Sequence, residues 1–165
     1  MARTHGVVQI HSAPSALCPH VEWAVGDIVG VPVRLDWTPQ PAERASYRAE
    51  YVWTGPVGSS AKLASALKGW QRLRFEVTED ATAASEAVRY SYTPALGVFH
   101  ATIGLHGDVM VNEERLKAAI ARDALGRRTL HDAIAGLLGT AWDDELEVFR
   151  QAGEGADVRW LHQVV

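Results

Sequence analysis

A single cysteine, Cys18, is present among the 165 residues, and this excludes an intrachain disulfide. The chain also lacks a long hydrophobic run, because Gln9 interrupts the short apolar stretch near its N-terminus. A signal peptide or membrane-spanning segment is therefore not expected, and the cytoplasm is the expected location. There is no glycine period, and the hydrophobic fraction of 47% is ordinary. These features argue against collagen-like, disordered and disulfide-stapled chains and favour a soluble globular protein.

The charge is modest and unevenly distributed. A formal net charge of −4 argues against a dedicated nucleic-acid binder. Residues 1–80 carry eight Lys/Arg and eight Asp/Glu, whereas residues 81–165 carry eight and twelve. Part of the acidic excess is the run Asp143, Asp144, Glu145 and Glu147. A solvated helix face is the favoured reading of this run, with a docking surface for a basic partner as the alternative.

In the first half, strand and helix patterns alternate. Period-two alternation predicts strands over 6–11, 31–37, 46–53 and 72–78, and apolar spacings of three and four predict helices over 16–29 and 59–69. Pro32 marks the second of these strands as an edge strand. The order βαββαβ predicts a ferredoxin-like unit, with a four-stranded antiparallel sheet and both helices on one of its faces.

The second half changes to consecutive strands followed by helices. Residues 86–104 read as a β-hairpin, and Asn112, Thr129 and Thr140 are predicted N-terminal caps of three helices. Residues 157–164 return to a strand-like pattern. The expected class is α+β, with a ferredoxin-like unit over 1–80 and a hairpin plus helices over 81–165. We expect the two parts to pack as one body, while two separate domains stay an alternative.

The segment 11–24, HSAPSALCPHVEWA, joins a predicted strand to a helix N-terminus. In the first turn of that helix the dipole stabilises a thiolate, so Cys18 with His11 or His20 is a candidate nucleophile. The favoured alternative is a structural cysteine, since two residues that are two positions apart on a helix do not face each other. Cys18 and His20 are therefore kept as weak candidates.

No metal, cofactor or phosphate site is expected. Cys18 and His20 have no second pair at ligand spacing, and His100 and His106 flank a turn without a nearby cysteine. The sequence GPVGSS, residues 55–60, precedes a helix whose N-terminus can hold an anion, but it lacks the lysine of a phosphate-binding loop. A helix cap is the favoured reading of that segment.

The polar face of the predicted sheet is the most informative feature for function. If Val8 and Ile10 point toward the helices, the other face gathers arginine, glutamate and histidine. The candidate binding residues on it are His11, Arg34, Arg48, Glu50, Arg72 and Arg74, accompanied by Gln9 and Glu76. Guanidinium groups bind carboxylates and phosphates bidentately, so this face suits an acidic ligand or protein. The equally weighted alternative is that the acidic C-terminal half covers it.

Three segments, HSAPSALCPHVEWA (11–24), LASALKGWQRLRFEVTE (63–79) and YTPALGVFHA (92–101), resemble the actinobacterial family Domain of Unknown Function 3145. The resemblance spans the whole chain and implies no catalytic, metal or cofactor residue. It implies an accessory or regulatory role in fatty-acid synthesis, near acyl carrier protein or acyl-CoA carboxylase.

Two classes of function follow from these observations. The first is a non-enzymatic binding or regulatory protein that acts through a protein partner, without nucleic acid or membrane. The second is a small enzyme, or a binder of a small molecule or acyl ligand, that uses His11, Cys18 and His20. An enzyme needs a base within reach of a nucleophile in a cavity, whereas a binding protein needs exposed Trp, Tyr or Arg. We expect some of Trp23, Trp37, Trp53, Trp142 and Trp160 to be exposed beside arginine.

Overall fold

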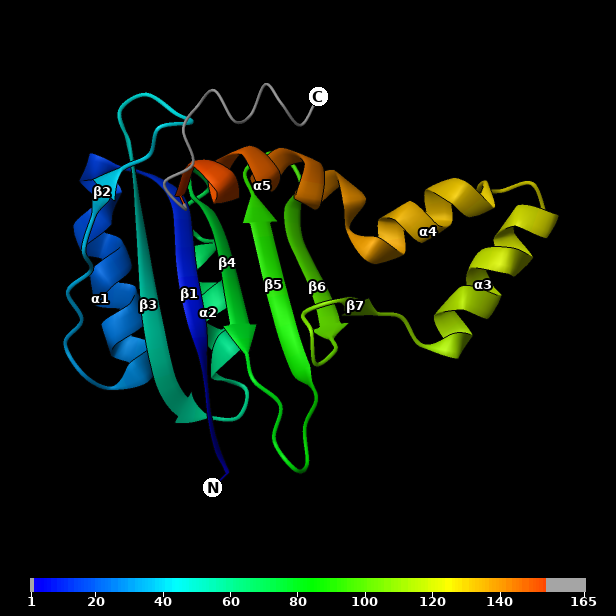
Figure 1. Cartoon of the computed structure of the whole chain (residues 1–165), viewed down its shortest axis with the longest axis horizontal. Coiled ribbons are helices and arrows are strands. Elements are labelled where there is room, and N and C mark those ends of the chain that lie inside the picture. Colours follow the sequence, from blue (N-terminus) through cyan, green and yellow to red (C-terminus); the bar gives the residue numbers. More distant parts are fainter. Residues whose placement is uncertain (1, 154–165) are drawn as a thin grey trace.

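A seven-stranded antiparallel sheet forms the centre of the protein, in a computed structural model that describes residues 2–153 (Figure 1). The strands lie in the order β2-β3-β1-β4-β5-β6-β7. Their bounds are Arg3–Pro14 (β1), Thr38–Pro39 (β2), Ser46–Pro56 (β3), Arg74–Glu79 (β4), Ala87–Thr93 (β5), Gly97–Ile103 (β6) and Val109–Met110 (β7). Because β4 pairs with β5, the described parts of the two halves share one sheet.

Helices cover both faces of the sheet. The helices α1 (Cys18–Val29) and α2 (Ser59–Leu67) lie together on one face, as predicted. The helix α5 (Thr140–Gly153) crosses the other face, and α3 (Glu113–Ala124) and α4 (Leu130–Leu138) project beyond β7 (Figure 1). The main core lies under α1 and α2 and is formed chiefly by Val8, Ile10, Val21, Val25, Trp53, Leu63, Leu67, Phe75 and Val77.

The α+β class is confirmed, while one predicted strand is wrong. Strand β1 pairs with β4, and β3 lies between β1 and β2, but β2 contains only Thr38–Pro39. Residues 32–37 form no strand although their apolar residues alternate. The backbone N–H of Leu35 instead donates to the Glu22 carboxylate on α1 at 2.6 Å. The exact ferredoxin-like topology is therefore not confirmed.

The second half follows the predicted order of elements. Strands β5 and β6 form the expected hairpin, paired from Ala87–Ile103 to Thr93–Gly97. The side chains of Asn112 and Thr129 accept hydrogen bonds from the backbone of Arg115 and Asp132, so these two caps are confirmed. Thr140 is already the first residue of α5 and not its cap. The predicted strand over 157–164 lies outside the described residues.

Candidate functional site

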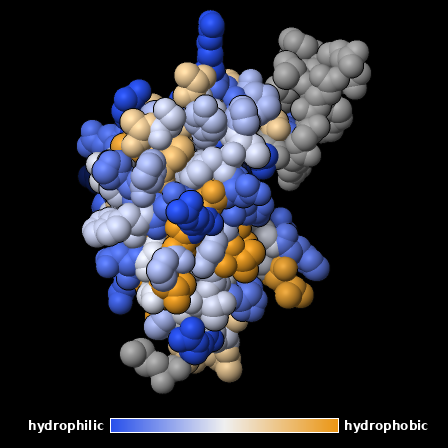
Figure 2. Space-filling model, turned by 90° about the vertical axis from the view of Figure 1, so that its left-hand side faces the viewer, coloured by the Kyte–Doolittle hydropathy of each residue, from blue (hydrophilic) through white to orange (hydrophobic). Residues whose placement is uncertain are grey.

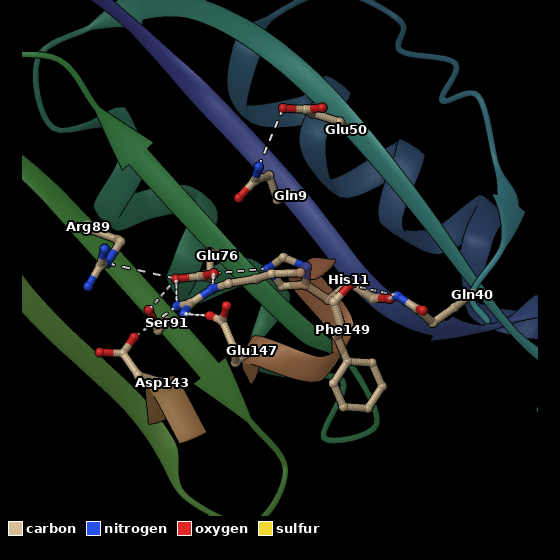
Figure 3. A network of polar contacts seen from close by, with 11 residues as sticks. Gln9, His11, Gln40, Glu50, Glu76, Arg89, Ser91, Asp143, Glu147 and Phe149 are labelled. Atoms are coloured by element: carbon tan, nitrogen blue, oxygen red, sulfur yellow. Dashed lines mark hydrogen bonds and ion pairs between the residues drawn. The ribbon is translucent and has the colours of Figure 1, made fainter. Parts of the chain in front are cut away.

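The polar face of the sheet is centred on a buried carboxylate, Glu76 of β4 (Figure 3). His11 Nε2 lies 3.0 Å from its Oε1, and Ser91 Oγ donates to its Oε2 at 2.8 Å. From α5, Arg150 donates through Nε at 2.7 Å and through Nη2 at 2.8 Å. This bidentate contact holds α5 against β1, β4 and β5. The face that the alternation in 72–78 predicted to be solvated is thus covered at Glu76.

The network fixes the charge states of its two central groups. Burial acts to raise the pKa of Glu76, but hydrogen bonds from His11 and Arg150 and the charge of Arg150 outweigh it, so this pKa lies far below its ordinary value of 4.5. Burial acts to lower the pKa of Arg150, and the bonds to Glu76 and Asp143 outweigh it and raise this pKa. The pair is therefore ionised across the physiological range.

Most of the acidic run of α5 is used within the chain. Asp143 and Glu147 contact Arg150 at 3.0 and 3.4 Å, and Glu145 contacts Arg74 at 3.1 Å. Among the described residues, only Asp144 of this run has no ion pair. The run is therefore neither a purely solvated face nor a free docking surface for a basic partner. The C-terminal half covers the β4 side of the polar face, as one of the two alternatives predicted.

The β3 side of the same face stays open. A cavity of about 330 Å³ lies there, lined by Gln9, Ile10, His11, Arg48, Ala49, Glu50 and Arg150. Gln9 Nε2 donates to Glu50 at 3.4 Å, and Arg48 donates to the Thr38 hydroxyl at 3.5 Å (Figure 3 shows the first pair). The structure therefore brings together three predicted residues, His11, Arg48 and Glu50, around a cavity of mixed charge.

The other predicted arginines lie away from this group. Arg72 and Arg74 line a cleft of about 400 Å³ at the end of β1 and β4, and Arg34 lies exposed in the segment before β2. The cleft residues are Pro14, Glu43, Arg44, Ala45, Gln71, Arg72, Arg74 and Pro94. We call this site the arginine cleft. Arg44 was not predicted, because it belongs to an irregular loop far from 72–74 in the sequence.

Within the arginine cleft, Arg74 is fully engaged. Its Nη1 donates to Glu43 at 2.7 Å and to Ser12 Oγ at 3.2 Å, and its Nε donates to Glu145 at 3.1 Å. Its guanidinium also lies over the Phe149 ring, 4.5 Å from the centroid. Arg74 is thus a structural residue that connects the cleft wall to α5.

Arg44 and Arg72 differ from Arg74 in both exposure and pairing. Both are exposed, and neither forms an ion pair with any residue in 2–153. Next to Arg44, Ala45 has a φ of 59°, the one positive φ of a non-glycine residue in the described chain. Such backbone strain persists where surrounding structure holds it, and here it shapes the rim of the cleft.

Other predicted sites have simpler explanations in the structure. At the N-terminus of α2, the anion is the protein's own Glu79, which accepts from the backbone of Gly58 and Ser60 at 3.0 Å each. Cys18 is buried, and burial raises the pKa of its thiol. Its Sγ contacts the Pro14 carbonyl at 3.6 Å.

The three residues of the enzyme hypothesis do not share a site. His11 faces Glu76 and α5, whereas Cys18 is part of the core under α1 on the opposite face of the sheet. His20 is exposed and lies beside the Trp70 ring, with centroids 6.0 Å apart. Within residues 2–153, no three His, Cys, Asp or Glu side chains gather as a metal site requires.

The tryptophans only partly follow the prediction. Trp53 is completely buried, Trp37 and Trp142 are half-buried, and Trp160 lies outside the described residues. Trp23 is 70% exposed beside a hollow of about 490 Å³, but the charged residues there are Glu22 and Asp27, not arginine. Figure 2, which looks onto the α1 and β3 side, shows hydrophobic residues as separate patches among hydrophilic ones.

The comparisons with known proteins give one result. The family model described as Protein of unknown function (DUF3145) matches residues 7–163, nearly the whole chain. The chain belongs to this family. Comparison with curated proteins and with solved structures found no match. No helix within the described residues has both the length and the hydrophobicity to cross a bilayer.

The segments that carry the resemblance to the DUF3145 family meet at the arginine cleft. Pro14 comes from the first segment, Gln71, Arg72 and Arg74 come from the second, and Pro94 comes from the third. Only Glu43, Arg44 and Ala45 come from elsewhere in the chain. The cleft is therefore the place where these three distant parts of the sequence form one surface.

Proposed function

We propose that this protein is a non-enzymatic accessory or regulatory protein that binds an acidic partner protein through the arginine cleft. One observation carries the proposal. Arg44 and Arg72 are exposed at the cleft without a carboxylate partner in residues 2–153, while Arg74 in the same cleft is neutralised by Glu43 and Glu145. Free guanidinium groups in a concave site favour carboxylates or phosphates on the surface that docks there.

The position of the histidines supports binding over catalysis. One ring nitrogen of His11 is hydrogen-bonded to the buried Glu76 carboxylate. Cys18, the only cysteine in the sequence, lies on the opposite face of the sheet from His11. A hydroxyl or thiol nucleophile within hydrogen-bond reach of a base is the minimum for covalent catalysis. The residues that line the cavity beside His11 include no hydroxyl or thiol, and the Ser91 hydroxyl that donates to Glu76 is buried away from that cavity.

The first partners to test come from the family resemblance, which implies fatty-acid synthesis. Acyl carrier protein and acyl-CoA carboxylase are therefore the partners that we propose. An acidic protein surface would meet Arg44 and Arg72 and leave the Arg74 bridge to Glu43 and Glu145 intact. Because the contacts are exposed and ionic, the affinity should fall as the salt concentration rises.

Calorimetric titration of the full chain with each purified partner tests the proposal. We expect one of them to bind, and the charge-reversed variant Arg44→Glu/Arg72→Glu to bind about tenfold more weakly or worse. Lys62→Glu/Arg127→Glu, an equal change of charge at two exposed sites outside the cleft, is the matched control and should bind as the wild type does.

Two results would contradict the proposal. The first is that neither partner binds the wild type, or that the Arg44→Glu/Arg72→Glu variant binds with unchanged affinity. The second is that the purified protein turns over a thioester or phosphate ester at a useful rate, in which case the enzyme hypothesis replaces the binding one.

A further inference from the structure

The helices α3 and α4 form an arm that stands away from the sheet (Figure 1). Both helices are described over their whole length, and each has one buried residue, Ala119 in α3 and Ala133 in α4. Alanine buries little surface, so the arm lacks a hydrophobic core of its own. A pair of short helices with so little burial gains stability by packing against a further element.

A groove runs between the two helices of this arm. Its volume is about 350 Å³, and we call it the arm groove. Its floor is made of Ala119, Ala133, Gly136, Leu137 and Trp142, and its charged residues are Arg115, Arg122 and Arg128. Trp142 is fixed at one end, because its indole N–H donates to the Gly97 carbonyl of β6 at 2.9 Å.

All the charge in the arm groove has one sign. No carboxylate lines it, and none of its three arginines forms an ion pair within the described part of the chain. The nearby Glu113 and Glu114 contact Lys117, at 3.2 and 3.7 Å. The side chain of Arg128 donates one hydrogen bond to the Asp132 carbonyl, which leaves its charge uncompensated. A ligand whose charge complements this groove is therefore anionic.

The spacing of the arginines indicates the shape of the ligand. Arg115 and Arg122 are seven residues apart on α3, which corresponds to about 10 Å along the helix axis. Two guanidinium groups anchored two turns apart favour a ligand with two separate anionic groups over a single small anion. Carboxylates seven residues apart on a partner helix are also about 10 Å apart and match this spacing.

The floor of the groove points to the same ligand. Leu137 and Trp142 are only half-buried there and offer apolar surface to another helix, whereas Gly136 lies beneath the Arg128 guanidinium, whose Nη2 is 2.9 Å from the position of a Cβ at that glycine. Such a helix, packed against α3 and α4, would complete a three-helix core that the arm lacks. Recognition of this kind uses apolar anchors at helical spacing on one face of the bound helix.

We propose that the arm groove docks an amphipathic helix of a partner protein, whose apolar stripe is flanked by Asp or Glu at a seven-residue spacing. The apolar side chains contact Leu137 and Trp142, and the carboxylates pair with Arg115 and Arg122. This surface shares no residue with the arginine cleft. It is therefore a second docking site, independent of the function proposed above.

A synthetic helical peptide tests the proposal directly. The probe is a fluorescein-labelled peptide of about 16 residues, with leucines on one face and glutamates seven residues apart beside them. A second peptide carries lysine at every glutamate position. Fluorescence anisotropy with the full chain measures affinity, and the indole N–H resonance of Trp142 reports occupancy of the groove.

The glutamate peptide should bind saturably and shift the Trp142 resonance, and the lysine peptide should bind at least about tenfold more weakly. The variant Arg115→Glu/Arg122→Glu should lose at least about tenfold in affinity. Arg127→Glu, at an exposed arginine of the same arm outside the groove, is the matched control and should stay within about twofold. Arg44→Glu/Arg72→Glu should bind the peptide as the wild type does.

Three outcomes would overturn the proposal. Binding of the glutamate peptide that is equal in wild type and Arg115→Glu/Arg122→Glu places the contact elsewhere. Equal binding of the two peptides would show that charge complementarity does not govern binding. No binding up to about 1 mM would show that the groove does not dock such a helix. Saturation of the Trp142 shift by inorganic phosphate, with displacement of the peptide, assigns the groove to a small anion.

Discussion

Replacing Arg150 by methionine removes the main partner of the buried Glu76 carboxylate and should destabilise the fold strongly. The Glu76 side chain is 4% exposed, and Arg150 gives it two hydrogen bonds, at 2.7 and 2.8 Å. After the substitution, Glu76 keeps His11, Ser91 and the more distant Arg89, whose Nε is 3.8 Å away. The carboxylate would then be a buried charge with weaker compensation.

The expected cost follows from the burial of the pair. Removing one member of a fully buried ion pair costs about 3–5 kcal/mol. Arg150 is 23% exposed, so water can partly replace its guanidinium, and we expect the lower end of that range, about 3 kcal/mol. Glu76→Gln/Arg150→Met should cost less than the sum of the two single variants, because it removes both members of the buried pair together.

Urea unfolding with linear extrapolation measures this cost. The matched control is Lys117→Met, which removes two ion pairs on the exposed arm, where Lys117 is 62% exposed. Its cost should be at most about 0.5 kcal/mol. A cost below about 1 kcal/mol for Arg150→Met would refute the view that this network attaches α5 to the sheet.

Three further predictions concern pH, the thiol and a close backbone contact. The pKa of Glu76 is lowered by folding, so its contribution to stability is present above its ordinary value of 4.5 and is lost as pH falls below it. In Glu76→Gln, the free energy of unfolding measured in urea should therefore decrease less as the pH is lowered than it does in the wild type. An unchanged pH dependence would contradict this role of Glu76. Cys18 should react slowly with a thiol reagent at neutral pH, and Cys18→Ser should cost about 1–2 kcal/mol; rapid labelling of the folded protein would argue against a structural role. Gly6→Ala places a Cβ 1.9 Å from the Thr78 carbonyl oxygen and should cost about 3 kcal/mol or more in thermal unfolding, whereas Gly69→Ala, with a nearest contact of 3.4 Å, should be nearly neutral.

Local patterns were sufficient to predict most elements of the fold. The alternation in 72–78 and in 86–104 marks strands that pair in the sheet, and the apolar spacing in 16–29 marks a helix on its core face. The same alternation failed in 31–37, because pairing depends on which neighbour accepts the backbone N–H. Leu35 donates to a side chain of α1 instead of a strand. No local pattern contains that information.

The candidate site depends on contacts between distant residues. Arg150 meets Glu76 across 74 positions, and Arg74 meets Glu145 across 71. The sequence marked the sheet face as rich in arginine, yet it gave no means to tell the paired Arg74 from the unpaired Arg72. Arg44 had no signal beyond its charge, since its place at the cleft depends on the path of the loop between β2 and β3.

An NMR titration of the isotope-labelled full chain with unlabelled acyl carrier protein is the most direct test of acidic-partner binding at the arginine cleft. The side-chain Nε–H resonances of Arg44 and Arg72 report on the two unpaired guanidinium groups, and that of Arg74 reports on the bridge to Glu43 and Glu145. We predict saturable shifts at Arg44 and Arg72 with little change at Arg74. Shifts that avoid the cleft, or none at all with acyl carrier protein and with acyl-CoA carboxylase, would contradict the proposed function.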